Sequence, residues 1–236
     1  MLTKAHAGWY ECYNFKGTID NYSISFSIQV RDGYYGEQDK KHFNLQGVYK
    51  YDKFNEPIKL VGQLNPKTNK VFLYEINNKQ DTAIFSFDLS ETVINGTWTS
   101  SKKKSITLKL TFVSKLIDTS ETIQFKDVQI LQSNSLSEFY FVGVYSKTTD
   151  DNRAKMDKLL ILKKKGNTLF QTIDFVKVET RTGNVMTIIF DNLEIADVKS
   201  KKLRVSNDIG RLGGYLTIRY NLKAKKFVLN PNPIAE

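Results

Sequence analysis

The stretch Gly47–Leu64, GVYKYDKFNEPIKLVGQL, carries the clearest structural signal in the chain. Its first part places Tyr49 and Tyr51 on one side of an extended strand, and residues 58–64 alternate in the same way. Alternation with a period of two is typical of a β-strand with one buried face. Between these parts, Asn55-Glu56-Pro57 is a turn signal, because proline fixes its own φ and disfavours helix at the residue before it. The stretch therefore predicts an antiparallel hairpin whose tyrosines face the core.

The same alternation recurs along most of the chain, for example in residues 24–30, 85–89 and 216–222. Polar turns separate these segments at intervals of about 10 to 15 residues, which is typical of antiparallel sheets. Lone glycines inside three segments, Gly47, Gly62 and Gly96, indicate bulges or sharp coiling. We therefore predict an all-β fold, built as an antiparallel up-and-down meander that is barrel-like or propeller-like.

The pattern loosens over residues 113–137, which we interpret as a connecting segment that carries one or two strands. This division allows two β subdomains, an N-terminal one over residues 8–112 and a C-terminal one over residues 138–236. The best helix candidate is the short stretch 148–160, TTDDNRAKMDKLL, which has two aspartates near its start and lysines later.

The 236 residues carry a formal net charge of +10. Short lysine clusters lie at 102–104, 163–165 and 199–202, and they fit either solvated turns or a face that binds a polyanion. Aromatic residues such as Tyr49 and Trp98 share their strand faces with aliphatic ones, so we expect them in the core and predict no nucleic-acid partner. No apolar run approaches the roughly 18 residues of a membrane helix, so we predict no membrane span.

Residues capable of catalysis are few. Cys12 is the single cysteine, and only His6 and His42 could act as its base. The acidic candidates for acid–base chemistry lie at expected strand ends or wet faces; they are Glu75, Asp88, Glu91, Asp174 and Glu179. No Gly-rich phosphate loop or nucleophile elbow is present in the sequence. We predict no enzyme activity, no catalytic residue, no metal site and no cofactor; an acidic pair meeting in a cleft would favour the enzyme alternative.

Three pieces of sequence stand in an order that resembles a known family. They are Gly-x-Tyr-x-Tyr followed by Ile-x-Leu-x-Gly within residues 47–62, a Leu-x-Glu strand at 73–75, and an aromatic strand leading to Gly96-x-Trp98. This order, over roughly residues 40–112, resembles the N-terminal part of a family of exported bacterial β proteins. Some members are immunity proteins that neutralise lysozyme-like, peptidoglycan-cleaving effectors injected by neighbouring cells.

The C-terminal half matches that family only in part. Residues 215–231, YLTIRYNLKAKKFVLNP, are similar to the family's Tyr-rich strand and Lys-Phe-Val ending. Many members carry an Asp-x-Asn-x-Asp-Gly calcium loop before that strand, whereas residues 190–198, FDNLEIADV, lack the motif. We therefore carry over no calcium ligand.

The resemblance implies a non-enzymatic, exported binding protein, an immunity protein whose partner is a cognate toxin effector. We expect contact through the long turn at 31–41, with Tyr34, Tyr35 and His42 as anchors, because aromatic residues dominate such interfaces. Since a net charge of +10 repels a basic enzyme, the target is acidic or the contact face differs from the average. The alternative is a β-barrel that binds a small ligand or glycan inside.

The N-terminus bears on localisation. Ala5-His6-Ala7 before Gly8 has the small-x-small form of a signal-peptidase site, although no apolar stretch precedes it. Export to the periplasm and an ordinary cytosolic N-terminus both fit this sequence. Oligomeric state stays open.

Overall fold

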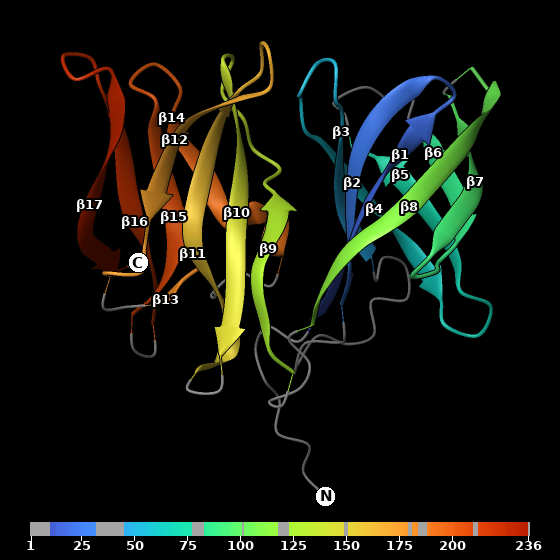
Figure 1. Cartoon of the computed structure of the whole chain (residues 1–236), viewed down its shortest axis with the longest axis horizontal. Coiled ribbons are helices and arrows are strands. Elements are labelled where there is room, and N and C mark those ends of the chain that lie inside the picture. Colours follow the sequence, from blue (N-terminus) through green and yellow to red (C-terminus); the bar gives the residue numbers. More distant parts are fainter. Residues whose placement is uncertain are drawn as a thin grey trace, which may run out of the picture. The chain divides into compact units, whose positions relative to one another are not determined.

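The alternating stretches become strands in a computed structural model of the chain, which describes residues 10–31, 45–76, 83–100, 102–117, 123–148, 151–178, 181–183, 188–209 and 212–235. The protein is all-β, as the sequence predicts. It divides into two compact units, Met1–Ile117 and Asp118–Glu236 (Figure 1). The boundary between the units falls within the segment 113–137 that we expected to connect two β regions.

The first unit is a closed barrel of antiparallel strands, in which each strand pairs with the next and the last returns to pair with the first. Its strands are β1 (Tyr10–Ile19), β2 (Tyr22–Arg31), β3 (Leu45–Tyr51), β4 (Ile58–Asn65), β5 (Lys70–Glu75), β6 (Ile84–Asp88), β7 (Val93–Thr99) and β8 (Ser105–Ile117). The hairpin predicted from Gly47–Leu64 is β3 and β4, paired from Leu45 opposite Gly62 to Tyr49 opposite Ile58. The unit therefore takes the barrel form of the predicted up-and-down meander.

Alternate residues along the strands fill the inside of this barrel. The ring centroid of Phe26 lies 5.2 Å from that of Phe85, 6.0 Å from Phe87 and 6.3 Å from Tyr49. The buried set is Tyr13, Phe15, Ile19, Ile24, Phe26, Ile28, Leu45, Tyr49, Leu60, Val71, Leu73, Phe85, Phe87, Ile94, Leu108 and Leu110. These side chains make the interior a packed core, stabilised by the burial of their apolar surface.

Glycine allows the barrel strands to approach one another closely. A Cβ built on Gly62 would lie only 1.9 Å from the carbonyl oxygen of Phe72 on β5. The pairings that contain Gly47, Gly62 and Gly96 run without a shift in register, so the bulges that we considered for these positions do not occur there. The glycines instead let neighbouring backbones come close where the sheet coils.

The second unit contains two antiparallel sheets. The first has the order β12-β11-β10-β9, formed by β9 (Phe125–Leu131), β10 (Phe139–Thr148), β11 (Asp151–Lys163) and β12 (Thr168–Asp174). The second has the order β13-β15-β16-β17, with β14 also paired to β15. Its strands are β13 (Arg181–Thr182), β14 (Leu193–Asp197), β15 (Lys202–Ile209), β16 (Leu212–Asn221) and β17 (Lys226–Ala235), and a short 3-10 helix, η1 (Ile189–Asp191), precedes β14.

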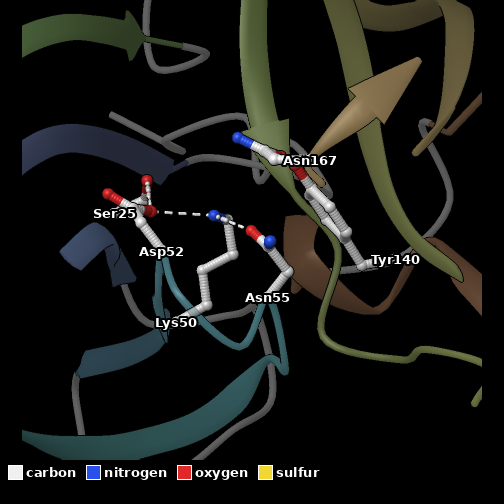
Figure 2. Close-up of polar contacts among 6 residues, drawn as sticks. All are labelled: Ser25, Lys50, Asp52, Asn55, Tyr140 and Asn167. Atoms are coloured by element: carbon white, nitrogen blue, oxygen red, sulfur yellow. Dashed lines mark hydrogen bonds and ion pairs between the residues drawn. The ribbon is translucent and has the colours of Figure 1, made fainter. Parts of the chain in front are cut away.

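Side-chain hydrogen bonds tie the edges and turns of this unit. The amide nitrogen of Gln171 on β12 donates to the carbonyl oxygen of Phe227 on β17, and its amide oxygen accepts from the Phe227 N–H, both at 2.8 Å. The Gln171 side chain thus makes the pair of hydrogen bonds that a backbone residue makes in an antiparallel sheet. It joins the edge strands of the two sheets. Tyr140 on β10 donates to the side chain of Asn167, in the turn between β11 and β12 (Figure 2).

The helix considered for residues 148–160 is wrong, because Thr148 ends β10 and residues 151–160 belong to β11. Tyr145 pairs with Met156 while Val144 pairs with Lys158, so Asp157 is the extra residue of a β-bulge. Because of this extra residue, the buried position that follows Met156 is Leu159 and not Lys158, so the period of two is broken there. Among the described residues, no helix has the length and the apolar character needed to cross a membrane.

Candidate functional site

The binding residues predicted from the sequence, Tyr34, Tyr35 and His42, lie outside the described residues. They belong to the chain between the end of β2 at Arg31 and the start of β3 at Leu45. Their role in binding stays a prediction.

An aromatic patch lies at the end of the barrel where β1 turns into β2 and β3 turns into β4. It consists of Tyr22, Tyr51 and Phe54. The ring of Tyr51 makes edge contacts with both others, with centroids 6.2 Å from Tyr22 and 6.5 Å from Phe54. Tyr22 is 56% exposed and Phe54 is 59% exposed. Exposed aromatic rings that contact one another are typical of protein-binding surfaces.

The turn that carries Phe54 is fixed by a polar clasp (Figure 2). The Nζ of Lys50 lies 2.8 Å from Oδ1 of Asp52 and 2.6 Å from Oδ1 of Asn55, and the hydroxyl of Ser25 donates to the same Asp52 oxygen at 2.8 Å. Lys50 is only 5% exposed, so its ammonium is removed from most solvent competition. The clasp therefore holds Phe54 on a well-defined turn.

Backbone bonds reinforce the clasp. The N–H groups of Phe54 and Asn55 both donate to the carbonyl oxygen of Tyr51, at 3.0 and 2.8 Å. Asn55 has a φ of 56°, in the left-handed region that asparagine tolerates better than most residues. The turn signal read from Asn55-Glu56-Pro57 thus marks the segment that presents an exposed aromatic ring.

A carboxylate lies next to the aromatic patch on the inner side of the barrel wall. Oε1 of Glu75 accepts hydrogen bonds from the hydroxyl of Tyr49, at 2.5 Å, and from Nε1 of Trp98, at 3.2 Å. The ring of Tyr49 is 5.6 Å from that of Tyr51. Burial, and then the charge of Glu75, raises the pKa of Tyr49, so this phenol stays a neutral donor. Among the described residues, no lysine or arginine forms an ion pair with Glu75.

The other acidic candidates do different work. Asp88 pairs with Lys70 at 3.3 Å, and Asp174 accepts the N–H of Val176 at 2.8 Å. Glu179 lies outside the described residues. These contacts are typical of surface ion pairs and turns.

Glu91 meets a second carboxylate through a shared lysine. Lys115 lies 2.9 Å from Glu91 and 3.2 Å from Glu11, while its ammonium sits 4.6 Å from the ring centroid of Tyr13. Tyr13 also donates a hydrogen bond to Glu11. Burial, followed by the bond to Glu11, raises the pKa of Tyr13 to about 12. The cluster is an ion network in which the Lys115 ammonium lies between the two carboxylates.

Cys12 is fully buried on β1, and burial raises the pKa of its thiol well above the ordinary value. A protonated, inaccessible thiol is a poor nucleophile. His6 and His42, the only possible bases, lie outside the described residues. Among the residues that the structure describes, no three His, Cys, Asp or Glu side chains gather as metal ligands would.

Comparisons with protein-family models, curated proteins and solved structures found no match to this chain.

Sequence reasoning missed the aromatic patch. Tyr51 was assigned to the core with Tyr49, but only Tyr49 is fully buried, at 1% exposure. Phe54 lies inside a turn and Tyr22 opens a strand, so neither takes part in a run of alternation. The available signal was the aromatic residue inside the polar turn YDKFNEP, because loops that display large apolar groups are often functional.

Proposed function

We propose that this chain is a non-enzymatic, exported binding protein, an immunity protein that blocks a toxin effector of the peptidoglycan-hydrolase type. The observation that carries the proposal is the aromatic patch on its clasped turn. The order of motifs within residues 40–112, which resembles a family with such immunity proteins, supports the choice of target. An inhibitor of a peptidoglycan hydrolase acts where the peptidoglycan lies, so the proposal includes export to the periplasm.

Rigid aromatic rings suit the task of occupying an active site. A partner that buries Tyr22 and Phe54 gains the apolar surface of both rings. Because Lys50, Asp52 and Asn55 already fix the turn, little conformational entropy is lost when the complex forms. Aromatic anchors in such pre-ordered loops often supply most of the binding energy of an interface.

The carboxylate of Glu75 bears on which charge the partner can carry. The net charge of +10 disfavours a basic enzyme when the molecule is taken as a whole. Next to the patch, however, the half-buried carboxylate of Glu75 offers an acceptor to a lysine or arginine of the partner. A basic effector could therefore dock at this end in spite of the average charge.

The packed interior bears on the alternative, a small ligand or glycan inside the barrel. Buried side chains occupy the inward positions of the described strands. This alternative therefore has no supporting observation among the described parts of the barrel.

The proposal is tested by binding to the product of the adjacent gene, which we expect to encode the effector. Full-length protein is used in a pull-down and in an assay of peptidoglycan cleavage by that effector. We expect stoichiometric binding and inhibition, and a loss of affinity of about 30-fold or more in Phe54→Ala, as for an interface hot spot. Phe72→Ala is the matched control, because Phe72 is an exposed aromatic residue on the barrel wall, at 41% exposure.

The two variants separate the possible outcomes. Inhibition that survives in Phe72→Ala and fails in Phe54→Ala supports the patch as the contact surface. Absence of binding to any neighbour-encoded effector would overturn the immunity function. Binding that both variants retain would move the contact surface away from the patch.

A further inference from the structure

A carboxylate lies above the packed core at the end of the barrel that carries the aromatic patch. Glu75 follows Leu73 on β5 by two positions, so it shares the inward face of the strand with that fully buried residue. Its Oε1 accepts hydrogen bonds from Tyr49 on β3 and from Trp98 on β7. In the closed barrel of β1 to β8, β3 and β7 lie on opposite sides (Figure 1). Bonds that meet from both sides therefore place the carboxylate near the middle of the barrel end.

Aromatic rings flank this carboxylate. Tyr51 and Trp98 are partly buried and pack against the core, and the ring centroids of Tyr51 and Tyr49 are 5.6 Å apart. Burial raises the pKa of Tyr51, a hydrogen bond with Tyr49 lowers it in part, and the charge of Glu75 raises it further. The hydroxyl of Tyr51 thus lies close to the bond between Tyr49 and Glu75. We call Tyr49, Tyr51, Glu75 and Trp98 the Glu75 site.

The charge of Glu75 has no counter-ion in the described part of the chain. No lysine or arginine there forms an ion pair with it, and no donor there bonds to its Oε2. Lys50, the buried lysine at the same end, is held by Asp52 and Asn55. Because Glu75 is half-buried, less water screens its charge than would screen a fully exposed carboxylate. The site therefore attracts a cation.

The hydrogen bonds already present decide which cation fits. A carboxylate oxygen has two lone pairs, and the donors Tyr49 and Trp98 occupy both of those on Oε1. The paired N–H groups of a guanidinium need both oxygens, and a primary ammonium brings three N–H donors to the one free oxygen. A quaternary ammonium has no N–H donor, so it leaves no polar group unsatisfied. Its methyl groups suit the faces of aromatic rings.

Exposed lysines at the same end limit the ligand to one charge. The odd-numbered strands of the antiparallel barrel all end here, so the turn after β7, with the exposed Lys102, Lys103 and Lys104, lies at this end. Exposed charges are largely screened beyond about 8 Å at physiological ionic strength, whereas a half-buried charge is screened less. A ligand with a single cationic head can therefore bind Glu75, but a polycation meets the repulsion of the lysines.

We propose that the Glu75 site binds a small quaternary ammonium compound, with the cation between the carboxylate of Glu75 and the rings of Tyr51 and Trp98. Sites for small molecules are frequent at the mouths of β-barrels, and aromatic rings are the usual surroundings of quaternary ammonium groups in proteins. The ligand stays at the end of the barrel, above the packed core. The proposal goes beyond the immunity function and does not rest on it, because its assay contains no effector.

The test is calorimetric titration of the full-length protein with choline chloride, with sodium chloride at equal ionic strength as the blank. Ethanolammonium chloride replaces the methyl groups by N–H groups, and 3,3-dimethylbutan-1-ol replaces the charged nitrogen by carbon. We expect saturable binding of one choline, weaker binding of ethanolammonium and no binding of the alcohol. Equal or tighter binding of ethanolammonium would overturn the assignment to a quaternary ammonium. The absence of choline binding, or equal binding of the alcohol, would overturn the site for a cation.

Charge variants locate the site. Glu75→Gln should raise the Kd for choline about tenfold or more, because it removes the attractive charge and keeps the size of the side chain. Glu91→Gln is the matched control: Glu91 lies in the turn between β6 and β7, at the opposite end of the barrel, and the Kd should stay within a factor of about two. Trp98→Leu should raise the Kd about fivefold, because it removes an aromatic face. Equal losses in Glu75→Gln and Glu91→Gln would overturn the Glu75 site.

A vesicle assay separates a free ligand from a lipid head group. We expect no sedimentation of the protein with phosphatidylcholine vesicles. Sedimentation that depends on Glu75, without binding of free choline, would overturn the assignment to a small molecule. Circular dichroism checks that the strands of each variant remain folded, and the comparison of choline with its uncharged analogue tests the proposal on the wild type alone.

Discussion

The hydroxyl of Tyr49 donates a hydrogen bond of 2.5 Å to the carboxylate of Glu75, although the strands that carry them, β3 and β5, are separated by β4. The bond therefore crosses the inside of the barrel wall and spans three strands. A hydrogen bond to a charged acceptor in a partly buried site is worth more than an average one. It links the packed core to the end of the barrel that carries the aromatic patch.

We expect Tyr49→Phe to lower the free energy of unfolding by about 1.5–3 kcal/mol, as for the loss of a hydrogen bond to a charged group. Urea denaturation followed by tryptophan fluorescence measures this change. Tyr22→Phe is the control: Tyr22 is 56% exposed, and its change should stay within about 0.5 kcal/mol. Equal effects of the two substitutions would mean that the hydrogen bond from Tyr49 to Glu75 adds nothing to the free energy of unfolding.

Alkaline pH should weaken the barrel through Tyr13. The pKa of this phenol is raised from 10.0 to about 12 in the folded state, so folding favours its neutral form. The stability that this shift contributes is fully present below pH 10 and is lost as the pH rises through about 12. In Tyr13→Phe, the free energy of unfolding should therefore fall less steeply between these pH values than in the wild type. An unchanged slope would contradict the contribution of Tyr13.

The thiol of Cys12 should not react with thiol reagents in the folded protein. It is fully buried and its pKa is raised by burial, so a disulfide reagent at pH 8 should react only with molecules that have unfolded. Labelling across a urea series should follow the unfolding of the barrel measured by fluorescence. Rapid labelling without denaturant would show that β1 opens independently of the rest.

Gly62→Ala should destabilise the barrel more than Gly47→Ala. The added Cβ would lie 1.9 Å from the Phe72 carbonyl oxygen at Gly62, but 3.0 Å from the Ser27 carbonyl oxygen at Gly47. Backbone must move in the first case, so we expect a loss of about 3 kcal/mol or more at Gly62 and about 1 kcal/mol at Gly47. Thermal and urea unfolding of both variants give the order, and a reversed order would contradict the close approach of β4 and β5.

Gln171→Leu should expose the amide of Phe227. The substitution removes both 2.8 Å bonds between β12 and β17, so hydrogen exchange at Phe227 should quicken. The amide of Val205, inside the second sheet, is the internal control and should keep its rate. If the Phe227 amide kept its protection, the two sheets would be held together by other contacts.

The sequence was sufficient to predict the strands, but it was not sufficient to predict that the barrel closes. Alternation depends on neighbouring residues, so the hairpin of Gly47–Leu64 could be read directly. The pairing of β1 with β8 depends on the register between residues about a hundred positions apart, such as Asn14 and Ser114, and no local pattern reports it. For the same reason the sequence did not reveal the bulge at Asp157, and the aspartates and lysines of residues 148–160 suggested a helix instead.

The candidate sites escaped sequence reasoning because their residues do not form motifs. Phe54 becomes prominent only when Lys50 and Asp52 fix its turn, and Tyr22 contacts Tyr51 only because β2 pairs with β3. Tyr34, Tyr35 and His42 were chosen by residue type within a long turn, and their role stays a prediction. Side chains gathered by pairing of distant strands need coordinates to be recognised.

The return of β8 to β1 also imposes an order of events when the chain is made. As the polypeptide emerges from N-terminus to C-terminus, from a ribosome or a translocation pore, β1 keeps an unpaired edge until Ile117 has appeared. Pairings between distant residues form slowly, and open strand edges recruit other chains. The first unit therefore passes through an interval in which seven strands exist without the eighth, and this interval is when a holding chaperone would matter most.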